Sequence, residues 1–214
     1  MVYFAIGPVE RLSAPTRLEF DSATALVVVD VQNDFADPSG SLYVDGGEEV
    51  VAAVNVEVAR AARAGAAVVY TQDWHPADTP HFAKDGGVWP VHCVGDTWGA
   101  RLHPALTVAE GAEFVRKGVD GQDGYSAFSV REPLTGARSA TALEGLLKAR
   151  GISRVVVVGL ATDYCVKETA LDAVRLGFDT AVLAGAIAAV DLEPGDGRRA
   201  VEQMRAAGAT VDEP

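Results

Sequence analysis

The stretch TALVVVDV at residues 24–31 is a short continuous run of apolar, mostly β-branched residues with an aspartate near its end. Such a run is typical of a strand that is buried on both faces of a parallel sheet. Asp30 stands where this strand should leave the sheet. In open α/β sheets ligands bind beyond the carboxyl ends of the strands, so Asp30 is expected at a functional edge.

The same pattern recurs along the chain and alternates with helical patterns. Similar apolar runs follow at residues 66–71, 154–160 and 179–185, and weaker ones at residues 112–118 and 209–213. Helical spacing of apolar residues is found at residues 48–65, 139–151, 162–177 and 198–208. This alternation predicts an α/β fold, a single three-layer α/β/α domain with a central, mostly parallel sheet. We expect residues 24–214 to form this domain and residues 1–23, which contain many turn signals, to be an N-terminal extension packed on it.

Composition excludes several classes of function. The chain has 214 residues and a formal net charge of −12, which argues against nucleic acid or an anionic membrane as a partner. No segment approaches the roughly 18 apolar residues that a membrane span needs. The opening MVYFAIGPVERL does not have the pattern of a signal peptide, and there are only two cysteines. We therefore expect a cytoplasmic protein that acts on a small molecule, while its oligomeric state stays open.

Two long segments do not fit the alternation of strands and helices. Residues 73–111 and 118–138 contain many Gly, Pro, Asp and aromatic residues. Long irregular loops inside a compact domain are uncommon and are often functional. They follow the strand ends marked by Asp73 and Lys117, so a site is expected there.

Cys165 is a candidate nucleophile because it falls in the first turn of the helix predicted for residues 162–177. The positive end of the helix dipole would lower the pKa of its thiol, and the unpaired backbone N–H groups would bind a developing oxyanion. Thr162 or Asp163 is expected to cap this helix. The alternative is a buried structural cysteine, which is common.

A nucleophilic cysteine needs a base, and Asp30 is the candidate. It follows five apolar residues, so partial desolvation would raise its pKa into a useful range. Lys117 also ends an apolar stretch, and a cation there would hold Asp30 and the thiolate in place. Taken alone, each residue has an ordinary alternative: a helix cap or surface ion pair for Asp30, and an exposed lysine for Lys117.

All four histidines of the chain fall between residues 75 and 103, which is a strongly uneven distribution. Asp73 and His75 are two residues apart, so in an extended chain they share one face. His81 and His92 follow in the same loop. One carboxylate with two or three imidazoles suits a single divalent ion, Zn²⁺, Fe²⁺ or Mn²⁺, with positions left open for water or substrate. The alternative is that the histidines are solvated loop residues.

Aromatic residues accompany these polar groups and would suit a flat apolar slot for an aromatic ring. They are Phe35, Trp74, Trp89, Trp98, Tyr125, Phe128 and Tyr164. Core packing is the alternative for each of them.

Five motifs in order make a resemblance visible. They are VVVDVQNDF (27–35), DWH (73–75), WPVHC (89–93), RKG (116–118) and GLATDYCVKETALDA (159–173). Together they closely resemble the nicotinamidases of the isochorismatase-like cysteine hydrolase superfamily, and the resemblance extends from residue 24 to about residue 212.

The resemblance implies a role for each candidate. It implies that Cys165 is the nucleophile, Asp30 its base and Lys117 the third member of a triad. The backbone N–H groups of Ala161 and Cys165 would form the oxyanion hole, after a cis peptide bond between Leu160 and Ala161. The implied metal ligands are Asp73, His75 and His92, with His81 as a fourth ligand in some family members. The implied substrate-binding residues are Phe35, Trp89, Tyr125, Leu160 and Tyr164.

The implied activity is metal-dependent hydrolysis of nicotinamide to nicotinate and ammonia through a Cys165 thioester, as a step of NAD salvage, with pyrazinamide as a second substrate. Three alternatives stay open at this point. The chain could be another amidohydrolase of the superfamily, a non-catalytic metal-binding module, or a redox protein in which Cys93 approaches Cys165. Because Cys93 borders His92, we interpret Cys93 as part of the pocket wall.

Overall fold

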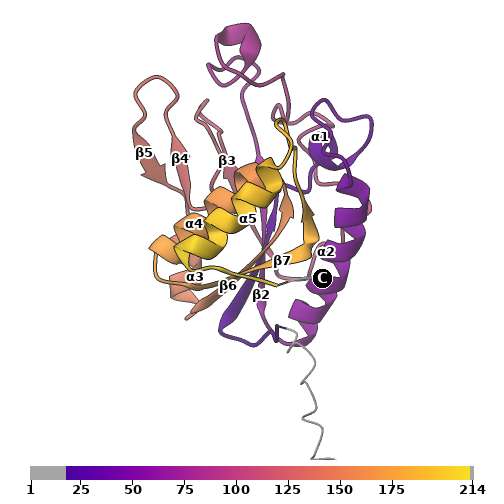
Figure 1. The fold of residues 1–214 in the computed structure, drawn as a ribbon, viewed down its shortest axis with the longest axis vertical. Coiled ribbons are helices and arrows are strands. Elements are labelled where there is room, and N and C mark those ends of the chain that lie inside the picture. The colour runs from indigo at the N-terminus through magenta and orange to yellow at the C-terminus, as the bar shows by residue number, and fades with distance from the viewer. Residues whose placement is uncertain (1–17, 213–214) are drawn as a thin grey trace, which may run out of the picture.

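The computed structural model describes residues 18–212, and six of its strands form one parallel sheet (Figure 1). Their order across the sheet is β3-β2-β1-β6-β7-β8. The bounds of these strands are β1 Thr24–Val29, β2 Ala67–Asp73, β3 Glu113–Lys117, β6 Arg154–Leu160, β7 Asp179–Ala188 and β8 Thr210–Asp212. All six lie where the apolar runs predict strands. The predicted α/β class with a parallel sheet is confirmed.

Helices cover both faces of the sheet, which makes the fold three-layered. Helix α2 (Gly47–Arg63) lies on one face, and α3 (Leu143–Ala149), α4 (Lys167–Arg175) and α5 (Asp196–Ala207) lie on the other (Figure 1). A fifth, short helix, α1 (Asn33–Ala36), follows β1 directly and has no counterpart in the sequence analysis.

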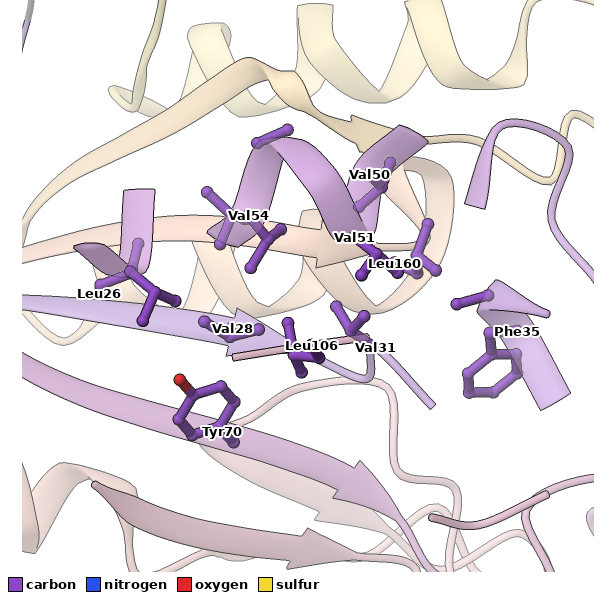
Figure 2. Close-up of a cluster of buried hydrophobic side chains, with 14 of the residues drawn as sticks. Leu26, Val28, Val31, Phe35, Val50, Val51, Val54, Tyr70, Leu106 and Leu160 are labelled. Carbon is purple, nitrogen blue, oxygen red and sulfur yellow. The ribbon is translucent and has the colours of Figure 1, made fainter. Parts of the chain in front are cut away.

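The core consists of two apolar layers, because successive side chains of a strand point to opposite faces of the sheet. In β1, Leu26 and Val28 pack toward α2, whereas Ala25, Val27 and Val29 pack toward α3, α4 and α5. Figure 2 shows the first layer, in which valines of α2 lie above β1 and Tyr70 of β2. Since both faces are covered, continuous apolar runs form the central strands.

One predicted helix boundary is wrong. The pattern at residues 139–151 predicts a helix capped by Ser139, but Arg138–Ala140 is a strand, β5, and α3 begins at Leu143. Strand β5 pairs with β4 (Ser129–Arg131) in an antiparallel hairpin apart from the main sheet. The side chains of β5 are exposed, so the strand carries no apolar run that would reveal it.

The N-terminal extension predicted for residues 1–23 lies mostly outside the described residues. In the part that is described, Leu18 and Phe20 pack against the core layer on the α2 side. The guanidinium of Arg60 in α2 donates a hydrogen bond to the carbonyl of Leu18 at 2.5 Å and lies 5.3 Å from the centre of the Phe20 ring. Between residues 18 and 212, none of the helices is both long and apolar enough to cross a membrane.

The sheet brings distant residues to one edge. Because β2 and β3 are parallel with Asp73 opposite Lys117, and β1 and β6 are parallel with Val29 opposite Gly159, the carboxyl ends of four strands meet. Asp30 follows β1 and Ala161 follows β6 at this edge. The two long irregular segments extend from the same edge, as the sequence predicts.

Candidate active site

Asp30, Lys117 and Cys165 form a buried cluster beneath the edge of the sheet. The ammonium of Lys117 donates to Asp30 Oδ2 at 2.7 Å and lies 3.8 Å from Cys165 Sγ. Lys117 and Asp30 have no exposed surface, and Cys165 is 7% exposed. The three residues predicted to form a triad therefore lie together, although Lys117 is 87 positions from Asp30 and 48 from Cys165 in the chain.

The carboxylate of Asp30 is held on both sides. Its Oδ1 accepts a hydrogen bond from the hydroxyl of Thr71 at 2.6 Å, while its Oδ2 accepts from Lys117. Its backbone has φ 49°, in the left-handed region where aspartate is better tolerated than most residues, and its N–H donates to Thr71 Oγ1 at 3.2 Å. Thr71 was not singled out in the sequence, although it stands two residues before Asp73 and so faces the same side of β2.

Burial raises the pKa of Asp30 to about 6, because desolvation penalises the carboxylate more than Lys117 stabilises it. A base with a pKa close to neutral can both accept and return a proton. The desolvation predicted from the apolar run before Asp30 is thus found in the structure.

The environment of Cys165 differs from the expectation. Burial raises the pKa of its thiol well above the ordinary value, the carboxylates of Asp30 and Asp73 raise it further, and Lys117 only partly opposes them. The predicted lowering by the helix dipole is therefore wrong for the resting site: desolvation outweighs it. The Cys165 thiol therefore keeps its proton until a base removes it.

The turn that carries Cys165 is π-helical. Residues Thr162–Val166 form this turn between β6 and α4. The prediction that Thr162 or Asp163 caps this helix is wrong, because neither side chain does so. Both oxygens of Asp163 instead accept hydrogen bonds from the backbone N–H groups of Val190 and Asp191, at 3.0 and 2.9 Å. The peptide bond between Leu160 and Ala161 is cis, as the resemblance implied.

Asp73 joins the cluster to the histidines. Its Oδ1 accepts from Lys117 at 2.7 Å, and its Oδ2 lies 3.8 Å from His75 Nε2 and 4.0 Å from His92 Nε2. Burial opposes its ionisation, but Lys117 and His75 hold the pKa of Asp73 below its usual value. Asp73 is thus an anion between one cation and two imidazoles.

His75, His81 and His92 come together and could hold a metal ion, since each brings a ring nitrogen within 4.8 Å of the others. All three are buried. His92 Nδ1 donates to the carbonyl of Pro90 at 2.8 Å, which leaves Nε2 as an acceptor. Burial lowers the pKa of His92 to about 4, so the ring is neutral and its lone pair is available.

His75 provides the test of whether these residues fit an ion. Both of its ring nitrogens are buried and have no hydrogen-bond partner within residues 18–212. Buried polar atoms normally have partners, so an unpaired imidazole beside a carboxylate and two further imidazoles is explained by a ligand bond. The predicted ligand set Asp73, His75, His81 and His92 fits one divalent ion.

A cavity of about 400 Å³, including its mouth, opens onto Cys165, His81 and His92. All five residues predicted to bind substrate line it, namely Phe35, Trp89, Tyr125, Leu160 and Tyr164. The indole N–H of Trp89 donates to the hydroxyl of Tyr125 at 2.7 Å, and the rings of Trp89 and Tyr164 meet edge to face at 4.8 Å. The side chains of Trp89, Tyr125 and Tyr164 would enclose a flat ring.

Sequence reasoning missed part of this cavity. Leu42, Val44 and Val190 also line it, but they stand in loops whose approach to the site no pattern indicates. Phe128, a further aromatic candidate, stacks on Phe178 in the core instead. Trp98 is 45% exposed, and Trp74 lies against the guanidinium of Arg116 at 3.6 Å.

Gln32 is a further buried residue beside the site that was not predicted. Its side-chain amide donates to the carbonyl of Asp73 and accepts from the N–H of Asp73, both at 2.8 Å. It also donates to the carbonyl of Ala100 at 2.8 Å. These bonds fix the backbone at the end of β2, so Gln32 orients Asp73 from behind. Its place in the motif VVVDVQNDF was the available signal.

The interpretation of Cys93 as pocket wall is wrong. Both cysteines are free, and Cys93 is fully buried in the apolar layer on the α2 side, whereas Cys165 packs in the opposite layer. Cys93 does not line the cavity onto which Cys165 opens. The redox alternative therefore has no support in this fold.

The fold and this site define a class. The chain belongs to the isochorismatase family, because the Isochorismatase domain matches residues 24–213. The family resemblance seen in the five motifs is thereby confirmed.

The chain is similar to particular relatives over most of its length. It is 39% identical over 203 residues to the nicotinamidase of Escherichia coli, covering 87% of this chain and 93% of the relative. Among solved structures, the pyrazinamidase of Pyrococcus horikoshii in complex with zinc is 35% identical, with a TM-score of 0.79, covering 90% of this chain and 99% of the other. The PnC1 protein of L. infantum in complex with nicotinate is 37% identical, with a TM-score of 0.82, covering 92% and 96%.

Proposed function

We propose that this protein is a nicotinamidase, which hydrolyses nicotinamide to nicotinate and ammonia through a thioester at Cys165. One observation carries the proposal: Cys165, whose thiol lies against the buried Asp30–Lys117 pair, lines an aromatic cavity that is also lined by His81 and His92 of the histidine group. The similarity to a nicotinamidase, a pyrazinamidase and a nicotinate-bound protein supports the same reaction.

The first step forms the thioester. Asp30 takes the proton of the Cys165 thiol, and Sγ attacks the carboxamide carbon of the substrate. The carbonyl oxygen becomes an oxyanion, which the backbone N–H groups of Ala161 and Cys165 would stabilise. When the tetrahedral intermediate collapses, the carbon–nitrogen bond breaks and Asp30 returns its proton to the leaving ammonia.

The second step consumes one water molecule. Asp30 takes a proton from the water, whose oxygen attacks the thioester carbon, and the carbon–sulfur bond breaks. The thiolate recovers the proton from Asp30, and nicotinate leaves. Throughout, Lys117 holds Asp30 in place. Burial opposes the charge of Lys117, but Asp30 and Asp73 raise the pKa of Lys117 well above its ordinary value, so Lys117 stays protonated.

Asp73, His75, His92 and His81 would hold the divalent ion. When bound, it would supply a Lewis-acid position for the lone pair of the pyridine nitrogen. The choice among Zn²⁺, Fe²⁺ and Mn²⁺ stays open, because the ligand types suit all three. Trp89 and Tyr125 would hold the flat ring so that its carboxamide faces Cys165. Pyrazinamide has a similar flat ring and carboxamide, so we expect it to be hydrolysed too, and we assign the nicotinate produced to NAD salvage.

Ammonia release from nicotinamide by the purified protein tests the proposal. We expect turnover that falls on chelation and returns when Zn²⁺, Fe²⁺ or Mn²⁺ is added back. Benzamide, which has the same carboxamide but no ring nitrogen, should be hydrolysed far more slowly. Turnover of non-aromatic amides without turnover of nicotinamide would contradict the proposal and favour another amidohydrolase of the superfamily. Absence of any amidase activity in a metal-loaded, folded sample would favour a non-catalytic module.

A further inference from the structure

Asp123 lies directly behind His81, in the loop between β3 and β4. Its Oδ1 is 2.7 Å from His81 Nδ1, and the two residues are only 6% and 5% exposed. Nothing in the sequence pattern singled out Asp123, because it stands in an irregular segment, 42 positions from its partner.

The other oxygen of Asp123 is also occupied. Arg131, at the end of β4, donates to Asp123 Oδ2 from Nη2 at 2.7 Å and from Nε at 3.1 Å. The backbones of the two residues also exchange hydrogen bonds, from Asp123 N at 2.8 Å and from Arg131 N at 2.9 Å. One carboxylate oxygen thus faces the histidine and the other faces the guanidinium, in a fixed orientation.

This arrangement sets His81 apart from His75 and His92 within the described residues. The backbone carbonyl of Pro90 accepts a hydrogen bond from His92 Nδ1, and the ring nitrogens of His75 have no hydrogen-bond partner there. A side chain fixes the ring of His81 alone among the three. The protonated nitrogen of an imidazole is set by the hydrogen bond that it makes, which leaves the other nitrogen as the donor to a metal.

We propose that Asp123 is a positioning residue for the metal site: it keeps the proton of His81 on Nδ1, so that the Nε2 lone pair is available to the ion, and Arg131 fixes which oxygen of Asp123 does so. The inference rests on the proposed metal-dependent function. The test of this inference nevertheless measures metal affinity, which does not depend on nicotinamide hydrolysis.

The Asp123→Asn variant makes the proposal specific. The guanidinium of Arg131 has only donors, so the single oxygen of the amide should turn toward Arg131. The NH₂ group then faces His81 Nδ1, which must become an acceptor, and the ring proton moves to Nε2. His81 would be held in the tautomer that cannot bind the ion. Removing Arg131 as well should free the amide oxygen to accept from His81 again.

The experiment measures Zn²⁺ and Mn²⁺ affinity of the full-length, metal-free chain by competition with a chelating dye. Asp123→Asn should weaken binding by about 10- to 100-fold, the usual range for partners behind a ligand. The double variant Asp123→Asn with Arg131→Ala should recover part of this loss, although Arg131→Ala alone should not improve binding. Thermal unfolding of the metal-free forms checks that each variant is folded.

Two controls match the charge changes. Asp120→Asn removes a carboxylate from the same loop, and Arg138→Ala removes a guanidinium opposite Arg131 in the hairpin register. Both should leave metal affinity within about twofold of the parent chain, since neither residue is bonded to the His81–Asp123 pair in the described structure. A charge effect on the whole site would instead weaken binding in Asp120→Asn and strengthen it in Arg138→Ala.

A spectroscopic reading keeps the proposal testable if a variant is unstable. Nitrogen-15 spectra of the metal-free parent should show His81, assigned with His81→Gln, with its proton on Nδ1, and Asp123→Asn should move it to Nε2. Unchanged metal affinity in Asp123→Asn, or a His81 proton on Nε2 in the parent, would overturn the proposal. Loss of nicotinamide hydrolysis with these metal-binding results intact would count against the proposed function alone.

Discussion

At the scale of single residues, Lys117 determines the charge balance of the site. It is fully buried and holds two carboxylates, Asp30 and Asp73, each at 2.7 Å. It also donates to the carbonyl of Gly124, so its three protons have three acceptors near the thiol. Desolvation raises the pKa of Asp30, and the charge of Asp73 raises it further, whereas Lys117 and the nearby histidines hold the pKa of Asp73 below its usual value despite its burial.

The pKa of Asp30, raised to about 6, predicts the pH dependence of the reaction. Asp30 must be ionised to take the thiol proton, so kcat/KM should be constant above this pKa and fall about tenfold per pH unit below it. We expect the acid limb to have its midpoint near pH 6 in steady-state measurements of ammonia release. Circular dichroism at each pH checks that the fold persists. A profile that stays flat down to about pH 4, the ordinary range of aspartate, would contradict this assignment.

Replacing Lys117 with Met should be severely destabilising. The side chain fits in length, but two buried carboxylates then lose their counter-charge, and we expect unfolding to become easier by about 3–5 kcal/mol at neutral pH. Urea unfolding measures the change. Adding Asp73→Asn removes one of the two unpaired charges and should recover part of the loss. A change below about 1 kcal/mol in Lys117→Met would show that the ion pairs do not hold the site together.

At the scale of elements, the meeting of β1 and β6 depends on Gly159. Its φ is 110°, and a Cβ there would overlap the carbonyl oxygen of Val29 in the neighbouring strand. Gly159 is also where the pairing of β6 with β7 changes register. The close approach fixes the register in which Asp30 follows Val29 and Leu160 follows Gly159, so this glycine shapes the site from outside it.

The Gly159→Ala substitution should therefore cost at least about 3 kcal/mol of unfolding free energy, from the overlap and the disfavoured φ together, and should lower activity. The matched control is Gly145→Ala in α3, where an added Cβ meets no neighbour and helix propensity should add about 0.5–1 kcal/mol of stability. Thermal or urea unfolding of both variants gives the comparison. Equal stability of the two would mean that the strands can separate without cost.

Elements with apolar patterns could be predicted, and elements held by distant polar contacts could not. The buried strands were located because both faces of the sheet are covered. Strand β5 was mistaken for the start of a helix because its side chains are exposed. The π-helical turn at Cys165 was read as a capped α-helix, since the bonds from Asp163 to Val190 and Asp191 span more than 25 positions of the chain and leave no local signal.

At the scale of the whole molecule, the parallel sheet is what assembles the site. Asp30, Asp73, Lys117 and Cys165 could be placed together in advance, because each stands at or past the carboxyl end of a strand. Residues that reach the site by loop packing, such as Val190 in the cavity and Asp123 behind His81, could not. The raised pKa of Cys165 could not be predicted either, because the burial that causes it appears only when the chain is folded.

The central claim is that Cys165 carries the acyl group during turnover. The most direct measurement is rapid quenching of the metal-loaded protein with nicotinamide, followed by mass spectrometry of the peptide that contains residue 165. We predict a nicotinoyl group on Cys165 that appears with the first ammonia and disappears as nicotinate forms, and neither adduct nor ammonia release in Cys165→Ala. Ammonia release by folded Cys165→Ala at a rate near that of the parent chain would contradict the account.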